Sequence, residues 1–352
     1  MNDTAGAPAQ TTMTLPVSVI MPVRNEERHL AESVGSILAQ DYAGELELLL
    51  AVGPSKDHTL EIANKLAATD PRVRVVENPT GQIPAALNLA VGATKHDVIV
   101  RVDGHALLPP GYIDTAVRTL RETGAVNVGG IMAAEGISPF QQAVAWAMTS
   151  PFGVGSAKYH TGGGAGEAHS VYLGAFRRSA IEGVGGYDER YLRAEDWEMN
   201  HRIRQAGGLI WFTPQMRVSY RPRATAGALA SQYFHYGRWR HVLARMHSGT
   251  INPRYLAPPA AVVAMLAGGL AGVAGLLALV SGAGSWWPWL LLAGFAAPVL
   301  YVLGVLAVTV AAARSLHGRA LAFLPVVLAT MHVAWGTGFL TSPRHLGSRS
   351  AR

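Results

Sequence analysis

Three long apolar runs near the C-terminus constrain the fold of this chain more than any other feature. They cover residues 257–280, 287–313 and 320–341 and carry almost no charge. A helix of about 22 residues, rising about 1.5 Å per residue, crosses the roughly 30 Å hydrocarbon core of a bilayer. Buried helices of a soluble core are the alternative, but three successive runs without a polar face rarely suit a globular domain. We therefore expect membrane helices here.

Residues beside these runs indicate their orientation. Three tryptophans within 286–289 fit an aromatic belt at the membrane interface. Arg314 and Arg319 lie between the second and third runs, and the positive-inside rule places them in the cytoplasm. A third full span would then put the arginines after residue 343 outside. The third run, which contains Pro325 and His332, therefore either spans the membrane or re-enters it.

Charge is unevenly distributed along the chain. All 23 acidic residues and 24 of the 29 lysines and arginines lie before residue 256, so the N-terminal part is close to neutral. It shows no basic stripe or helix-turn-helix context, which argues against a nucleic-acid partner. The absence of cysteine excludes disulfides and thiolate metal sites. Residues 1–14 lack the pattern of a signal peptide, so we expect the first domain in the cytoplasm.

Strand and helix patterns alternate through the N-terminal half. Apolar, β-branched runs predict strands, and helical spacing of apolar residues predicts the intervening helices. The expected strands are 15–23, 46–52, 73–77 and 97–102, and the expected helices are 27–40, 59–68, 83–92 and 194–206. The alternation predicts an α/β fold with a mainly parallel sheet and helices on both faces. Such sheets bind ligands at the carboxyl ends of their strands.

A glycine-rich segment interrupts this pattern between Gly153 and Gly166. It is too flexible for a core element and long enough to form a mobile loop. A functional lid and a plain linker are both compatible with it.

Asp103 follows an expected strand and precedes Gly104 and His105, so its carboxylate should stand at a strand end. Asp and His together suit Mn²⁺, whereas Mg²⁺ prefers oxygen ligands. An ion at this place would bridge a diphosphate and neutralise a leaving nucleotide. The alternative is that Asp103 and Gly104 simply form a turn.

Two further segments have the residue types needed for catalysis. Glu195 and Asp196 open an expected helix, where carboxylates are favoured by the helix dipole and where one of them could also serve as a general base. The segment 235–240 combines aromatic residues with Arg238 and Arg240 shortly before the first apolar run. It either sits at lipid headgroups or binds a diphosphate.

Taken in order, four short motifs resemble the signature of the family 2 inverting glycosyltransferases, which have the GT-A fold. The motifs are Pro22-Val23-Arg24-Asn25-Glu26-Glu27, Val102-Asp103-Gly104-His105, Glu195-Asp196 and Arg238-Trp239. The resemblance runs from about Val17 to Arg240. It extends to bacterial exopolysaccharide enzymes of the succinoglycan type through the segment 185–189 and the membrane tail.

The resemblance implies a role for each motif. The nucleotide-sugar site would be formed by Pro22, Val23, Arg24, Asn25, Glu26, Asp57 and Asp103. The acceptor hydroxyl would be deprotonated by Asp196, with Glu195 beside it, in a single displacement that inverts the anomeric configuration. Arg238 and Trp239 would close over the diphosphate and acceptor. Asp103 and His105 would hold a divalent metal, Mn²⁺ rather than Mg²⁺.

Three departures from the family pattern affect the substrate. Val52 and Gly53 stand where the family usually has acidic residues, so a UDP-sugar is favoured only weakly as donor, although Asp57 matches the later acid. His105 replaces the second Asp of the metal motif. His235 replaces the Gln that usually begins the Arg-Trp motif, and this change bears on acceptor binding.

The resulting prediction is a multi-pass glycosyltransferase, of hexosyltransferase type, in the bacterial inner membrane. It would transfer a sugar to a lipid-linked or polysaccharide acceptor in exopolysaccharide or cell-envelope glycan synthesis. Its parts would be a disordered tail (1–14), a cytoplasmic GT-A domain (15–255), a membrane domain of two or three helices (256–343) and a basic tail (344–352). A membrane tail suits a lipid-linked acceptor because it confines enzyme and substrate to one surface.

Three alternatives compete with this prediction. A processive synthase would need more spans for an export channel. A catalytically inactive binding partner would have no need to keep Asp103, Asp196 and Arg238 together. A transporter would need more polar groups inside its spans than His332 alone.

Overall fold

The computed structural model describes residues 14–155 and 157–347. Most of the expected N-terminal tail, and the part of the basic tail from residue 348 onward, therefore lie outside the described residues. The strands are β1 (Val17–Val23), β2 (Leu46–Val52), β3 (Val73–Glu77), β4 (Val98–Arg101), β5 (Asn127–Ala134), β6 (Gly166–Glu167), β7 (Tyr172–Arg177) and β8 (Ile210–Tyr220).

Helices follow most of the strands. They are α1 (Leu30–Leu38), α2 (Thr59–Thr69), α3 (Ile83–Ala93), α4 (Tyr112–Thr123), α5 (Pro139–Met148), α6 (Pro151–Val154), α7 (Lys158–Thr161), α8 (Arg178–Gly183), α9 (Glu195–Gln205) and α10 (Ala226–Met246). The C-terminal helices are α11 (Pro253–Val280), α12 (Trp287–Leu292), the short 3₁₀ helix η1 (Ala293–Phe295), α13 (Ala296–Ala312) and α14 (Gly318–Leu340).

The strands form one sheet in the order β3-β2-β1-β4-β7-β5-β8-β6. β1 pairs in parallel with β2 and β4, and β2 pairs in parallel with β3. β7 joins β4 in the antiparallel direction. Every residue of β2 and six of the seven in β1 are buried, as a strand covered on both faces requires. The predicted α/β class with a mainly parallel sheet is confirmed.

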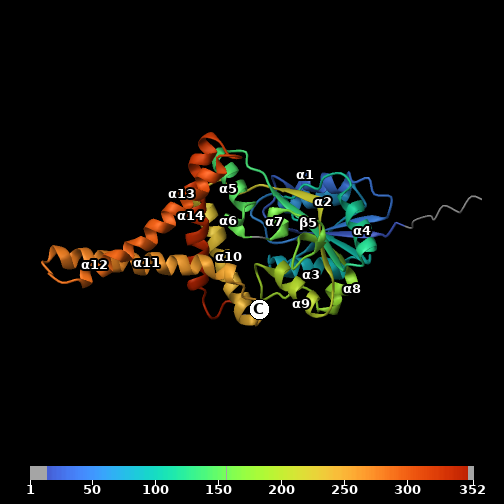
Figure 1. Ribbon diagram of the computed structural model, residues 1–352. Helices are drawn as coiled ribbons and strands as arrows, with labels where there is room; N and C mark the ends of the chain where they lie inside the picture. Colours follow the sequence, from blue (N-terminus) through green and yellow to red (C-terminus); the bar gives the residue numbers. More distant parts are fainter. Residues whose placement is uncertain (1–13, 156, 348–352) are drawn as a thin grey trace, which may run out of the picture. The chain divides into compact units, whose positions relative to one another are not determined.

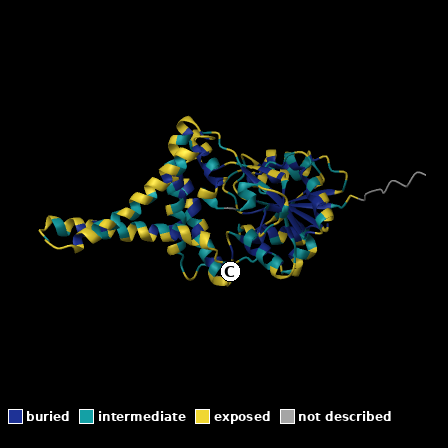
Figure 2. Cartoon of the chain, viewed as in Figure 1, coloured by how far each residue is buried: buried dark blue, intermediate teal, exposed yellow. Residues whose placement is uncertain are grey.

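The chain divides into two compact units, and the first contains residues up to 129 with 173–187 and 203–211. It holds the parallel strands, with α1 and α2 on one side of them and α3 on the other (Figure 1). The strands form the buried centre of this unit (Figure 2). Because these strands are parallel, the carboxyl ends of β1, β2 and β4 lie at the same edge of the sheet.

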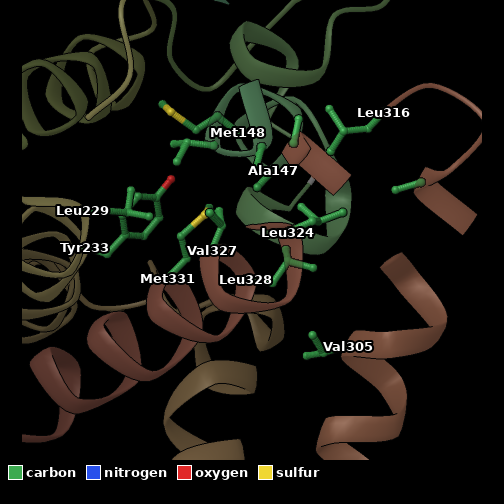
Figure 3. Packing of buried hydrophobic residues seen from close by; sticks show 14 of the residues in the cluster. Ala147, Met148, Leu229, Tyr233, Val305, Leu316, Leu324, Val327, Leu328 and Met331 are labelled. Atoms are coloured by element: carbon green, nitrogen blue, oxygen red, sulfur yellow. The ribbon is translucent and has the colours of Figure 1, made fainter. Parts of the chain in front are cut away.

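The second unit contains residues 130–172, 188–202 and those from 212 onward. Its core lies where α5, α10, α13 and α14 pack together (Figure 3). The cluster includes Met148 from α5, Leu229 and Tyr233 from α10, and Leu324 and Met331 from α14. Here α14 packs along α10 as well as against the other apolar helices.

The three expected membrane segments are all helical. Pro253–Val280, Trp287–Ala312 and Gly318–Leu340 are each long and apolar enough to cross a bilayer. Many of their side chains are exposed (Figure 2). The third segment is one continuous helix although it contains Pro325. α11 packs closely on η1, since a Cβ at Gly268 would lie 2.4 Å from the carbonyl oxygen of Gly294.

The glycine-rich segment contains the single-turn helix α7 between residues in the left-handed region. The φ angles of Gly155 and Gly162 are 76° and 78°, which glycine adopts without a Cβ clash. As expected, its described residues form no extended core element.

Candidate active site

The loop after β1 is bonded to the loops after β2 and β3 within the first unit. Arg24 Nε and NH1 donate to the carbonyl oxygens of Pro54 and Gly81, at 3.2 and 3.3 Å. Asn25 has a φ of 55°, a value that asparagine tolerates, and its N–H donates to Ser55 Oγ at 3.1 Å. These contacts fix the first predicted motif at the carboxyl end of the parallel strands.

The two residues that begin this motif contribute differently. Val23 is 2% exposed, so its side chain belongs to the core, and its carbonyl oxygen accepts from the N–H of Gly53. Pro22 is half-buried in β1. Both hold the strand end in place.

Asp57 lies two residues before the start of α2. Its Oδ1 accepts from the Thr59 N–H at 3.2 Å and from Thr59 Oγ1 at 2.6 Å, and its Oδ2 accepts from the Glu27 N–H at 3.3 Å. The hydrogen bond from Thr59 keeps the pKa of Asp57 below its usual value. Both oxygens of the carboxylate, expected to contact the nucleotide, thus already bind protein groups.

Asp103 and His105 lie just after β4, beside the end of β1. The Asp103 side chain is 25% exposed, and its Oδ1 lies 3.3 Å from both Nε and NH2 of Arg101. His105 Nδ1 lies 2.8 Å from Glu26 Oε1. Gly104 between them allows a close approach, because a Cβ there would lie 3.1 Å from Glu26 Cγ. The first unit therefore brings Glu26, Asp103 and His105 together.

Asp196 lies in the first turn of α9 within the second unit. Ala194, just before the helix, has a φ of 61°, which is strained for a residue with a side chain. Glu195 is 6% exposed, whereas Asp196 is half-buried and accepts from the Trp197 N–H at 2.6 Å. Of the two candidate bases, Asp196 is the more accessible to a substrate.

Glu198, one turn further along α9, belongs to a buried network that the sequence did not reveal. Its carboxylate is 1% exposed and accepts from Arg202 Nε and NH2, at 2.8 and 2.7 Å. His247 Nε2 lies 3.1 Å from Glu198 Oε1 and also 3.1 Å from the Tyr191 hydroxyl. This network ties α9 to the residue that follows α10.

Arg238 and Trp239 lie on α10 and face different surroundings. The Arg238 guanidinium lies 4.4 Å from the centre of the Phe234 ring. Trp239 is 5% exposed and packs in a cluster with Tyr191 and Leu243. Trp239 therefore contributes to the core of the second unit, while Arg238 keeps a partly accessible cation.

An additional cation lies close to Asp196. Arg240 packs between the rings of Trp197 and Tyr255, 4.4 and 4.1 Å from their centres. Burial raises the pKa of Tyr159 to about 12, and the negative charge of Asp196 adds to this effect. The segment 235–240 was expected to sit at lipid headgroups or bind a diphosphate, but Arg240 was not singled out within it. Its place directly after the Arg-Trp pair was the available signal.

The predicted site residues thus form two sets, one in each unit. The first unit gathers the loop 22–26, Asp57, Asp103 and His105, and the second gathers Glu195 and Asp196 near the aromatic residues of α10 and α11. In the described ranges, 14–155 and 157–347, no group of three or more His, Cys, Asp or Glu residues is arranged to hold a metal alone. Asp103 and His105 could supply only part of a coordination shell.

The sequence of this chain is similar to those of known glycosyltransferases. The profile of "Glycosyl transferase family 2" matches residues 18–185. The succinoglycan biosynthesis protein ExoA of Rhizobium meliloti is 32% identical over 323 residues, which is 91% of this chain and 93% of that protein. A Methanococcus voltae protein, named as a dolichyl N-acetyl-α-D-glucosaminyl phosphate 3-β-D-2,3-diacetamido-2,3-dideoxy-β-D-glucuronosyltransferase, is 22% identical over 69% of this chain and 77% of its own length.

A solved structure has a similar fold. The mannosyltransferase PcManGT from Pyrobaculum calidifontis, in complex with GDP-Man and Mn²⁺, superimposes with a TM-score of 0.56 at 20% identity. The match covers 94% of this chain and 88% of that one. The expected GT-A architecture is confirmed.

Proposed function

The chain belongs to glycosyl transferase family 2 and is a glycosyltransferase, and we propose its reaction on that basis. We infer that it transfers a sugar from a nucleoside diphosphate to a lipid-linked or polysaccharide acceptor, with inversion, during exopolysaccharide synthesis. The observation that carries this proposal is the placing of Asp103, His105 and Glu26 together at the carboxyl ends of β1 and β4. Ligands of α/β sheets bind at that edge.

The donor set at this edge fits a divalent metal whose remaining ligands come from the substrate. Asp103 offers a partly exposed carboxylate, and the contact with Glu26 orients the His105 ring. Two protein ligands leave positions for diphosphate oxygens and water. One carboxylate and one imidazole suit Mn²⁺ better than Mg²⁺. The Mn²⁺ in PcManGT supports this choice. When bound, the ion would stabilise negative charge on the departing diphosphate.

The nucleotide would lie against the bonded loops after β1 and β2. Arg24 and Asn25 are exposed there, and their contacts with the second loop hold both loops in place before the donor binds. We keep a UDP-sugar as the first donor to test, on the match between Asp57 and the family pattern. Asp57 would support the pocket by holding the loops together, because its oxygens already accept hydrogen bonds.

Asp196 would act as the base. Its half-buried carboxylate is anchored by the N–H of Trp197, and it would take the proton from the acceptor hydroxyl as that oxygen attacks the anomeric carbon. The bond from that carbon to the diphosphate breaks in the same step, so the configuration inverts. Arg238 would neutralise phosphate charge on the reactants.

The membrane helices would confine the enzyme to the surface where a lipid-linked acceptor lies. We propose that residues 15–255 carry catalysis on the cytoplasmic side of the inner membrane and that 256–343 form the membrane part. The segments that could cross a bilayer support this division. The name of the Methanococcus relative, which describes a dolichyl-linked phosphate acceptor, supports a lipid-linked acceptor here.

The proposal is tested by nucleoside diphosphate release from detergent-purified protein. UDP-, GDP- and dTDP-sugars are compared, each with Mn²⁺ and with EDTA, for the wild type and Asp103→Asn. We expect slow release from one donor with Mn²⁺, lost with EDTA and strongly reduced in the variant. A folded protein that binds a nucleotide sugar but cleaves none would contradict the proposal and favour a binding partner.

A further inference from the structure

Arg240 is a cation held in aromatic surroundings. Its guanidinium lies between Trp197, on the helix of the proposed base, and Tyr255, in the first turn of α11. Within the described part of the chain, its NH1 atom is buried and has no hydrogen-bond partner. A buried donor without a partner costs free energy that an incoming anion would recover.

A second arginine lies next to it. The Arg254 guanidinium lies 4.8 Å from the centre of the Tyr255 ring, and its NH2 donates to the Tyr255 hydroxyl at 2.7 Å. Arg240 and Arg254 therefore stack on the same ring. Two like charges this close are unfavourable unless an anion lies with them.

The electrostatics of the surrounding groups agree with this geometry. Burial lowers the pKa of Arg240, and Arg254 lowers it further, while Asp196 and the Tyr255 and Tyr159 hydroxyls act in the opposite direction. Tyr159, Asp196, Arg240, Tyr255 and Arg254 thus share one electrostatic neighbourhood. Asp196 is among these groups, and the proposed function needs its carboxylate as the base.

The position of the cluster favours a ligand at the membrane surface. Arg254 and Tyr255 open α11, the first helix able to cross a bilayer, and the Tyr255 ring stacks on Trp335 of α14 at 6.4 Å. Trp335 in turn stacks on Phe339 at 5.5 Å. Aromatic rings with basic side chains at the ends of membrane helices are typical of headgroup sites.

We propose that Arg240 and Arg254 bind the phosphate group of a lipid-linked acceptor, with Trp197 and Tyr255 holding Arg240 in place beside the proposed base. The planar guanidinium can donate two parallel hydrogen bonds to phosphate oxygens. The lipid chain would follow α11 and α14 into the membrane. This inference rests on the proposed function and names the acceptor's phosphate as the group that is recognised.

The test measures equilibrium binding of a polyprenyl phosphate, in detergent micelles, to the full-length protein. The same polyprenol without phosphate and inorganic pyrophosphate are the comparison probes. The variants are Arg240→Gln and Arg254→Gln, and the matched control is Arg223→Gln, which changes an exposed arginine before α10. Thermal unfolding of each variant shows whether it is folded.

We expect Arg240→Gln to raise the dissociation constant for the lipid phosphate about 10- to 100-fold, since hydrogen bonds to charged groups are lost. Arg254→Gln should raise it less, Arg223→Gln should leave it unchanged, and the polyprenol should bind weakly to every protein. If Arg240→Gln does not fold, the same assay is made with Arg254→Gln. A dissociation constant for the lipid phosphate that is unchanged in Arg254→Gln then overturns the proposal.

Three other results would also overturn it. These are unchanged lipid-phosphate binding in folded Arg240→Gln, equal binding of the polyprenol, and pyrophosphate binding that depends on Arg240 and is as tight as that of the lipid. The last result would assign the site to a soluble phosphate. Lipid-phosphate binding without donor cleavage by the wild type would instead contradict the proposed function and leave this site standing.

Discussion

The loop cluster of the first unit and the α9–α10 region of the second unit satisfy their polar groups in opposite ways. In the first, Arg24, Asn25 and Asp57 bind neighbouring loops through short hydrogen bonds. In the second, Arg238 and Arg240 lie against aromatic rings, and each has a buried nitrogen without a partner in the described part of the chain. The first region is therefore set before any ligand binds, whereas the second keeps positive charge for an anionic ligand.

The largest expected effect comes from Asp196→Asn in the second region. Removing the base should lower the rate of sugar transfer about 10²- to 10⁴-fold while donor binding is kept. The measurement is transfer of labelled sugar to acceptor in a membrane extract, with Glu135→Gln, an exposed change in the same unit, as the control. A transfer rate equal to that of the wild type would remove Asp196 from the chemistry.

The next largest effect tests the first region. Asp103→Asn should lower Mn²⁺-dependent donor cleavage about 10²- to 10³-fold, because a ligand of the charge-stabilising ion is lost. A titration with Mn²⁺ should show weaker activation than in the wild type. The same activity and the same Mn²⁺ dependence in both proteins would mean that Asp103 only forms a turn with Gly104.

The third prediction concerns the buried network that supports α9. Glu198→Gln should lower the free energy of unfolding by about 1–3 kcal/mol, because Arg202 and His247 lose a buried charged partner. Thermal unfolding in detergent measures the loss. Glu122→Gln, which is exposed on α4, serves as the control and should change little. Equal unfolding of the two variants would show that the network contributes nothing to stability.

The fourth prediction uses pH. Burial lowers the pKa of His160 from 6.5 to about 4, and its Nδ1 is buried without a partner in the part of the chain described. As the pH falls, His160 takes up a proton near pH 6.5 in the unfolded chain but only near pH 4 in the folded chain. The free energy of unfolding is therefore not reduced by His160 above pH 6.5, and it falls by about 1–3 kcal/mol as the pH decreases towards 4.

Replacing this histidine by a neutral ring tests the sign of that effect. His160→Phe should unfold with a melting temperature that depends less on pH between 6.5 and 4 than that of the wild type. An identical pH dependence in the two proteins would show that His160 is protonated in the folded state as readily as in the unfolded chain.

The smallest effect is expected for Asp57→Asn in the first region. The amide keeps one acceptor oxygen for the start of α2 but loses the second, so the melting temperature should fall slightly. The choice of nucleotide in the donor panel should not change. A switch from one nucleotide to another would show that Asp57 contacts the base despite its hydrogen bonds.

The fold was predictable where one pattern determined each element. β2 and β3 have the predicted bounds. β2 is buried along its whole length, as a parallel strand covered on both faces requires, whereas β3 lies at the edge of the sheet and only its first residue is buried. α1 begins at Leu30, three residues later than expected, and the N–H of Glu27 before it binds Asp57 of a distant loop. α11 begins at Pro253, before the expected run, because Asn252 caps it. The sequence does not reveal this long-range bond or this cap geometry.

The candidate site was predictable only in part, for a similar reason. Asp103 and Asp196 were found because each follows a local signal, a strand end or a helix start. The contact between Arg240 and Tyr255 has no such signal, since it depends on how α10 and α11 pack. The burial of Trp239 beside Tyr191 also depends on tertiary packing. Motifs in the sequence therefore gave the proposed reacting groups, and packing gave the groups that surround them.

The most direct test of the central claim is the incorporation of labelled sugar, from the donor identified in the panel, into lipid extracted from membranes containing this protein. We predict labelled lipid with Mn²⁺ for the wild type, and almost none with EDTA or with Asp196→Asn. Donor cleavage without labelled lipid or polysaccharide, or labelling that persists in Asp196→Asn, would contradict the account.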